Sequence, residues 1–342
     1  MILSSLKELR LYIPAHALDE IEPLMGAIDN SEHDSLTAIL GKSLYDRLCE
    51  YYGTVDVDSF EAAVRNQQLD TEYDHLLHLA QNIVAYDVMP TVAKLSVISI
   101  NNAGINSPTS EDYGKVTDSD IQTFTQESVS GKHKGINRLL EQLEEWAKEV
   151  QSNPVDVDVE DYTVEEIVAK WRESRYYYLA ASLLIPSALV LQRHIDIYES
   201  REKFIQLLPD LRYVQEQIIT PAIGEEFCEY LADKSLHGTD DKVLARIITM
   251  LRTAMAFHLQ SRTEVLKLSE KARTRAHDDA VLTLNRAMEY IPQQQDYLLT
   301  LTDTFKSSPL YKQTTATDTT RPERKFTNDD HRHAMFITPM LH

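Results

Sequence analysis

Two short stretches with one shared pattern decide how this chain is organised: LGKSLYDRL at residues 40–48 and IGEEFCEYL at residues 223–231. They are 183 positions apart, counted from Gly41 to Gly224. The apolar residues before the first stretch recur at the same offset: Leu24, Met25, Ile28 and Leu36 correspond to Leu207, Leu208, Leu211 and Ile219. Similarity at a fixed offset predicts that the chain contains two divergent copies of one module.

The glycine in each stretch lies inside an apolar helical pattern. Glycine in a helix interior costs about 1 kcal/mol relative to alanine. We therefore expect Gly41 and Gly224 to have a structural role, at a close approach of two segments or at a helix break. A phosphate-binding loop is not indicated, because Leu36 occupies the position where that motif needs a glycine before Gly41-Lys42-Ser43.

Apolar residues recur at steps of three and four along most of the chain, which is typical of amphipathic helices. We expect helices over residues 24–48, 76–90, 136–146, 164–184, 200–234, 242–260 and 276–290, with Pro90 ending the second. Residues 95–100 alternate in the manner of a strand and precede the turn-forming residues 101–104. A second β-like run is expected at residues 264–268. The fold class predicted is mainly α, with a minor β-hairpin.

The polar stretch at residues 151–158 suggests a boundary between two helical modules, residues 1–150 and 160–302. Ser, Thr, Lys, Asp and Pro dominate after Asp303, so residues 303–342 are predicted to form an extended C-terminal arm. The arm ends in apolar residues, and we expect these to bind the arm's own domain, a neighbouring subunit or another protein. The expected partner-binding residues are Met335, Phe336, Ile337 and Met340.

Charge and cysteine content limit the classes of partner. Asp and Glu number 54 against 34 Lys and Arg, a net charge of -20 that repels phosphate backbones. We expect no sequence-specific nucleic-acid binding, although an acidic channel wall would let DNA slide past. The apolar stretch at residues 176–192 contains Pro186 and two serines, which favours buried helix and loop over a membrane contact. Cys49 and Cys228 are isolated, which indicates a reducing compartment and no cysteine zinc site.

Candidate catalytic and metal-binding residues are weak. Asp74, His75 and His78 share a helical spacing, and His331 and His333 lie beside two aspartates, but neither group supplies a complete ligand set. The adjacent carboxylates Glu144-Glu145, Glu165-Glu166 and Glu225-Glu226 point in different directions on a helix and indicate surface charge. Cys228 lies in an apolar helix, which predicts an inert thiol. We expect no catalytic residue, metal or cofactor, and hence no enzyme; a metal enzyme using His75 and His78 is the third-ranked hypothesis.

Tyr176-Tyr177-Tyr178 leaves two readings open. Tyrosine combines a large apolar ring with a polar tip, so it is favoured both in half-buried helices and at subunit contacts. The pattern favours a helix half buried in its own domain, with an inter-subunit contact as the alternative.

Residues 23–48, PLMGAIDNSEHDSLTAILGKSLYDRL, together with ISINNAGI at residues 98–105, resemble the head-to-tail connector or adaptor proteins of tailed bacteriophages. The pattern is most similar to the connector-like family of crAss-like phages and gut-bacterial prophages, whose helical bundle carries an early (L/I)-G-x-x-L-Y-x-x-L helix end. The resemblance covers residues 1–150 directly and 200–300 through the repeat, and excludes the tail. That family offers no catalytic residues to carry over.

The resemblance implies a virion structural protein, assembled in the host cytoplasm, that forms a homo-oligomeric ring between portal and tail. Its expected partners are further copies of itself, the portal and other tail or ring proteins, with DNA passing through the channel and no membrane. The alternative is a cytoplasmic helical scaffold or regulatory protein-binding module.

Overall fold

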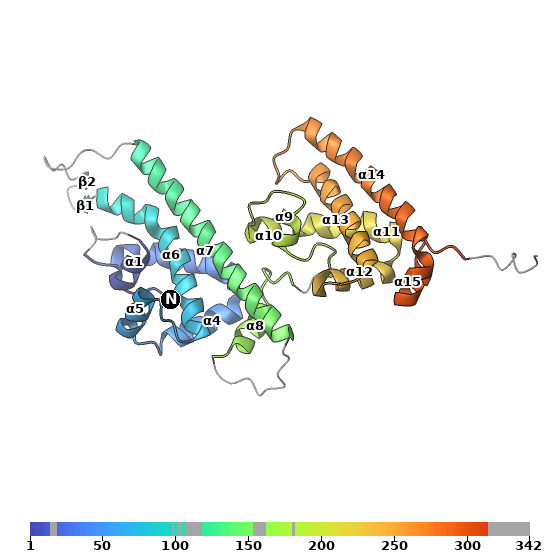
Figure 1. Ribbon diagram of the computed structural model, residues 1–342. Helices are drawn as coiled ribbons and strands as arrows, with labels where there is room; N and C mark the ends of the chain where they lie inside the picture. Colours follow the sequence, from blue (N-terminus) through green and yellow to red (C-terminus); the bar gives the residue numbers. More distant parts are fainter. Residues whose placement is uncertain are drawn as a thin grey trace, which may run out of the picture.

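The computed structural model describes residues 1–13, 19–97, 99–101, 104–106, 118–152, 162–179 and 182–313. Within these ranges the chain is mainly helical, which confirms the mainly-α part of the predicted fold class. The chain forms two neighbouring bodies, and each is built around a pair of long helices: α6 with α7 in the first and α13 with α14 in the second (Figure 1). None of the helices in the described ranges is long and apolar enough to cross a membrane.

The first body contains helices α1 to α8. These helices are α1 (Leu6–Tyr12), α2 (Met25–Ser31), α3 (Thr37–Leu40), α4 (Lys42–Tyr52), α5 (Val57–Asn66), α6 (Glu72–Val97), α7 (Asp118–Ser152) and α8 (Val164–Trp171). Between α6 and α7, strand β1 (Ser99–Asn101) pairs antiparallel with β2 (Gly104–Asn106), and Ile100 lies opposite Ile105.

The second body repeats this arrangement in shorter form. Its helices are α9 (Ala188–Gln192), α10 (Arg201–Val214), α11 (Thr220–Ile223), α12 (Glu225–His237), α13 (Lys242–Arg262), α14 (Glu270–Gln293) and α15 (Gln295–Leu301). A 3-10 turn at Thr304–Ser307 follows, as another at Glu22–Leu24 precedes α2. Residues 264–268, expected to be β-like, lie in the loop between α13 and α14, because they connect two helices that pack along each other.

Helix α6 does not end at Pro90 as predicted but continues to Val97, across part of the stretch expected to be a strand. A proline inside a helix removes one hydrogen bond and costs about 3 kcal/mol. Burial along α6 offsets this cost, because Val84, Val88 and Met89 are all removed from solvent. Tertiary packing therefore overrides the local helix-ending signal.

The two bodies share one backbone path around the glycines. In each, a π-helical turn leads into a four-residue helix, a glycine, and a longer helix, and every boundary from the start of the π turn to the start of the longer helix is repeated at the offset of 183. The π turns are Glu32–Leu36 and Gln215–Ile219. Gly41 has φ 79° and ψ 157°, and Gly224 has φ 89° and ψ 149°. We call the helix–glycine–helix units around Gly41 and Gly224 the glycine elbows.

Each elbow contacts a turn that follows the long helix pair of its own body. We call residues 171–177 and 305–311 the closing turns. In the first, the Ser174 amide donates to the Trp171 carbonyl at 2.8 Å; in the second, Ser308 donates to Phe305 at 3.1 Å. A Cβ on Gly41 would lie 3.2 Å from Ser174 Cβ. At Gly224, a Cβ would lie 3.1 Å from Ser308 Cα.

The closing turns move the limits of the two bodies away from those expected. Trp171 and Phe305 are fully buried, and the Trp171 ring packs edge-on against the ring of Tyr177 as Phe305 does against Tyr311. The first body therefore extends beyond residue 150 to Tyr177, and the second extends beyond 302 to Tyr311. The chain does not leave its domain at Asp303, because burying an aromatic ring stabilises the turn that follows it.

Candidate protein-binding sites

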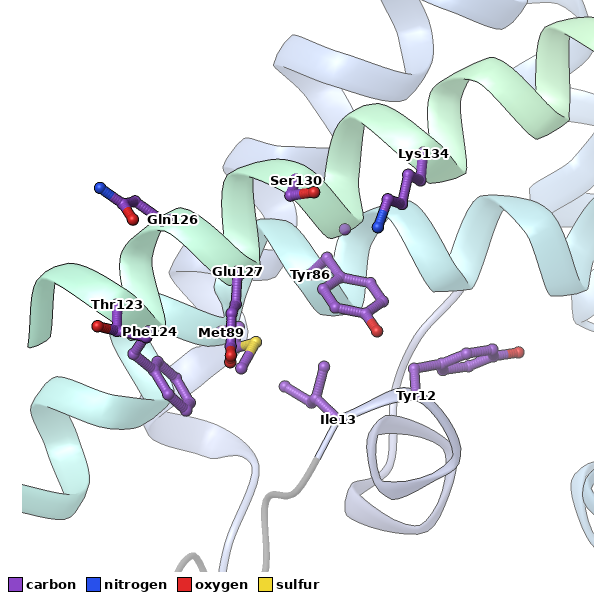
Figure 2. A pocket seen from close by; sticks show the side chains of 11 residues that line it. Tyr12, Ile13, Tyr86, Met89, Thr123, Phe124, Gln126, Glu127, Ser130 and Lys134 are labelled. Atoms are coloured by element: carbon purple, nitrogen blue, oxygen red, sulfur yellow. The ribbon is translucent and has the colours of Figure 1, made fainter. Parts of the chain in front are cut away.

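A pocket of about 570 Å³ opens between the end of α1, the second half of α6 and the first half of α7 (Figure 2). Its apolar wall consists of Ile13, Met89, Phe124 and the ring of Tyr86. In Figure 2 the side chains of Met89 and Phe124 point from the helices toward Ile13. The polar lining is Tyr12, Thr123, Gln126, Glu127, Ser130 and Lys134.

Two glycines on α7 allow this geometry. A Cβ on Gly131 would lie 2.1 Å from the ring of Tyr86, and one on Gly135 would lie 2.9 Å from Ile83. Without these side chains α7 approaches α6 closely, and the Tyr86 ring lies against the α7 backbone at the pocket. A salt bridge between Lys132 and Asp87, at 2.8 Å, joins the same two helices.

The pocket has the size and character of a site for apolar side chains. Pockets of about 300–1,000 Å³ with apolar walls and a few polar groups are typical of binding sites. Glu127 and Lys134 place one negative and one positive charge in the lining. The arrangement can therefore take the apolar residues of a peptide segment and hydrogen-bond its backbone.

A buried polar network fixes α1, and with it one side of the pocket. The carboxylate of Glu8 is fully buried and accepts hydrogen bonds from the Gln81 amide at 2.9 Å and the Tyr52 hydroxyl at 2.9 Å. The Tyr12 hydroxyl donates to the side-chain oxygen Oε1 of Gln81 at 3.0 Å and lies 3.1 Å from His78 Nδ1. Tyr12 is therefore held in place where it lines the pocket.

The candidate metal ligands Asp74 and His78 have different partners. Asp74 accepts a hydrogen bond from Tyr51 at 2.8 Å, whereas His78 faces Tyr12. Burial lowers the pKa of His78, with smaller contributions from His75 and Arg138. Across the ranges that the structure describes, no three His, Cys, Asp or Glu side chains are grouped to hold a metal. His331 and His333 lie outside those ranges.

The junction between the two bodies is a second site, built around a buried arginine. Arg201, at the start of α10, pairs with Glu144 of α7 at 2.9 Å and with Glu141 at 3.1 Å. The side chains of Arg201 and Glu144 are each only 3% exposed. The Tyr178 hydroxyl also donates to Glu144, and the Arg201 amide donates to Asn137 Oδ1 at 2.9 Å. Breaking one partner of such a pair is costly, so the junction holds α7 and α10 in one orientation.

Two sequence interpretations are corrected at this junction. Glu144 was expected on the surface beside Glu145, but the packing of α10 against α7 buries it. The three tyrosines were expected in a helix, but the helix ends at Trp171 and they follow it in a turn. Burial and the Glu144 carboxylate raise the pKa of the Tyr178 phenol. A lone Arg201 behind a helix-capping serine gave no local signal of burial.

The other carboxylate pairs and the cysteines have separate positions. Glu166 pairs with Arg47 at 2.8 Å, beneath the ring of Tyr162. Glu225 and Glu226 are exposed. Burial raises the pKa of the Cys228 thiol, which fits an unreactive core residue.

The expected partner-binding residues fall outside the described residues. They are Met335, Phe336, Ile337 and Met340. Comparison with known proteins finds no matching family model, no similar curated protein and no similar solved structure.

Proposed function

We propose that this protein is a structural subunit of a tailed-phage virion, a head-to-tail connector that forms a ring with copies of itself between portal and tail. The observation that carries the proposal is the pocket between α1, α6 and α7, which can receive an apolar segment of a neighbouring chain. Its occupant is the segment 334–341, which includes Phe336 and Ile337, from another copy.

The length of the C-terminal segment favours a neighbour over the same chain. Twenty residues, 314–333, separate the last described residue from the apolar segment. A chain of that length without fixed structure would span about 25 Å on average, at about 5–6 Å times the square root of its length. The pocket lies against α1, and Figure 1 shows α1 and α15 at opposite ends of the molecule. A domain of this size is about 35–40 Å across, so the same chain would have to cross more than its average reach.

Charge supports an apolar contact between copies. Residues 314–342 contain four Lys and Arg and four Asp and Glu, so the net charge of -20 lies in the rest of the chain. Acidic bodies repel one another, but the C-terminal segment does not add to this repulsion. Ring formation should therefore strengthen as salt screens the bodies. DNA would pass through the acidic channel without sequence-specific contacts.

The test compares the full chain with a chain truncated after Pro322. Electron microscopy and mass photometry should show oligomers of the full chain and smaller particles after truncation. Circular dichroism should show that the truncated chain keeps the helices of the full chain. Ser130→Trp should fill the pocket and weaken association as well. Glu145→Trp, exposed on the same helix outside the pocket, is its matched control.

Two results would contradict the proposal. If the truncated chain loses its helical content, the segment belongs to its own core. If the full chain remains monomeric at high salt and in the presence of purified portal protein, it is not a connector. Association instead with an unrelated cellular protein through the same pocket would favour a cytoplasmic scaffold or regulatory module.

A further inference from the structure

The outer face of α7, turned away from α6, contacts the start of the second body, which buries Glu144 and leaves His133 and Glu141 exposed. Its contact residues are spaced four, four and three apart, as one stripe of a helix requires. His133 Nδ1 lies 2.6 Å from a Glu202 carboxylate oxygen, and Asn137 accepts from the Arg201 amide. Glu141 and Glu144 complete the stripe through their salt bridges to Arg201.

Helix α14 corresponds to α7 in the second body. The residues of α7 that meet α6 include Gly131 and Gly135, four positions apart. Ala276 and Ala280, also four apart and buried, occupy the corresponding places where α14 packs along α13. Adding 145 to each α7 position aligns these two inner stripes. At the same offset, the positions equivalent to the outer stripe of α7 are Asp278, Leu282, Arg286 and Glu289.

This outer stripe of α14 is exposed along its whole length. Leu282 is 48% exposed, and its neighbour Val281 is 42% exposed. Leu282 is equivalent to Asn137 of α7, so α14 has an apolar side chain at the position where α7 has an amide. We call this stripe with Val281 the α14 outer face.

The start of the first body is the complementary open end. At the offset of 183, Ile21 corresponds to Phe204, which is fully buried beside Tyr178 at the junction. Ile21 and Met25 keep part of their surface exposed, whereas their counterparts Phe204 and Leu208 are buried. Among the described residues, the start of the first body and the outer stripe of α14 are thus each more exposed than their counterparts at the junction.

We infer that the start of the first body of a second copy, residues 19–31, binds the α14 outer face in the place that α10 takes on α7. The inference rests on the proposed self-association and adds a second contact between copies to the one at the pocket. Contact between different faces of identical chains is heterologous, so it closes into a ring or extends as a filament. The interface inside one chain is then repeated between chains, as in stacked repeat proteins.

Equivalence also predicts which side chains meet. Glu202 and His133 contact each other at the junction, and their counterparts are Asp19 and Asp278. Both aspartates are exposed. Two like charges at this position weaken the contact at low salt, so its association should strengthen as salt increases.

The test uses the full-length chain and one pair of cysteines. An equal mixture of Asp19→Cys and Asp278→Cys proteins should form a cross-linked pair with a short bis-maleimide reagent, because the equivalent Glu202 and His133 side chains lie 2.6 Å apart at the junction. Each variant alone supplies the background from the native cysteines. Asp240→Cys, also exposed, replaces Asp278→Cys in the control mixture.

A second measurement tests the apolar contact. Leu282→Glu should raise the dissociation constant for self-association about tenfold or more, whereas Leu236→Glu, an exposed leucine on α12, should leave it unchanged. Rings without the Asp19–Asp278 link, or equal effects of the two leucine variants, would overturn this inference and leave the ring proposal standing. A link formed by Asp278→Cys protein alone, beyond the wild-type background, would indicate symmetric α14 pairing and also overturn it. A chain that stays monomeric contradicts both.

Discussion

Replacing glycine by alanine at five positions separates backbone strain from side-chain crowding in this protein. Gly41 and Gly224 combine a positive φ with a close neighbour. Gly238 has φ 83° but no atom within 4 Å of an added Cβ. Gly131 has the crowding without the positive φ, and Gly26 has neither. Gly26 lies in helix α2 and serves as the control.

The expected magnitudes follow from these geometries. A backbone with φ near 80–90° and ψ near 150° is almost restricted to glycine, and a side chain there costs about 1–3 kcal/mol. Crowding by a nearby group adds about 1–3 kcal/mol. Loss of glycine's flexibility in the unfolded chain returns about 0.4–1 kcal/mol. We expect Gly41→Ala and Gly224→Ala each to lower the free energy of unfolding by about 2–4 kcal/mol.

Urea unfolding followed by two signals measures this effect in each body. The two tryptophans, Trp146 and Trp171, lie in the first body, so their fluorescence reports on it alone. Circular dichroism reports on both bodies. With a slope of about 2 kcal/mol per molar urea, Gly41→Ala should shift the fluorescence midpoint down by about 1–2 M. Gly224→Ala should shift mainly the dichroism transition.

The controls decide whether the reasoning holds. Gly238→Ala should cost less than Gly224→Ala, and Gly26→Ala should be neutral or stabilise by up to about 1 kcal/mol. If Gly41→Ala and Gly224→Ala are as stable as Gly26→Ala, the glycine elbows carry no strain and the shared backbone path has no energetic basis. If Gly238→Ala costs as much as Gly224→Ala, contact with the closing turn contributes nothing.

Three further outcomes are expected from buried groups. Arg201→Met should lower the free energy of unfolding by about 3–5 kcal/mol, and adding Glu144→Leu should recover most of that loss in the same urea experiment. Burial holds the pKa of His258 below its ordinary value of 6.5, with His277 contributing; the unfolded chain then binds more protons, so stability should fall as pH drops from 7.5 toward 5, and His258→Gln should flatten that slope. Alkylation by iodoacetamide, followed by mass spectrometry, should modify Cys49 well before the buried Cys228.

The sequence by itself determined the helical class and the repeated stretches around the two glycines. Both depend on local spacing. Apolar residues at steps of three and four predict a helix, and a glycine within that pattern predicts a break in it. The helix predicted at residues 242–260 is accordingly found at Lys242–Arg262. The breaks at Gly41 and Gly224 also lie where the shared pattern placed them.

Only the tertiary structure decided where each body ends and which polar groups are buried. The closing turns around Trp171 and Phe305 are 134 positions apart, not 183, because the first body has the extra helix α5 and a longer connection between its two long helices. A comparison at one fixed offset therefore loses them. Pro90 and Glu144 carry local signals for a helix end and for a solvated surface. Both signals are overridden, because packing against another helix depends on residues far away in the sequence.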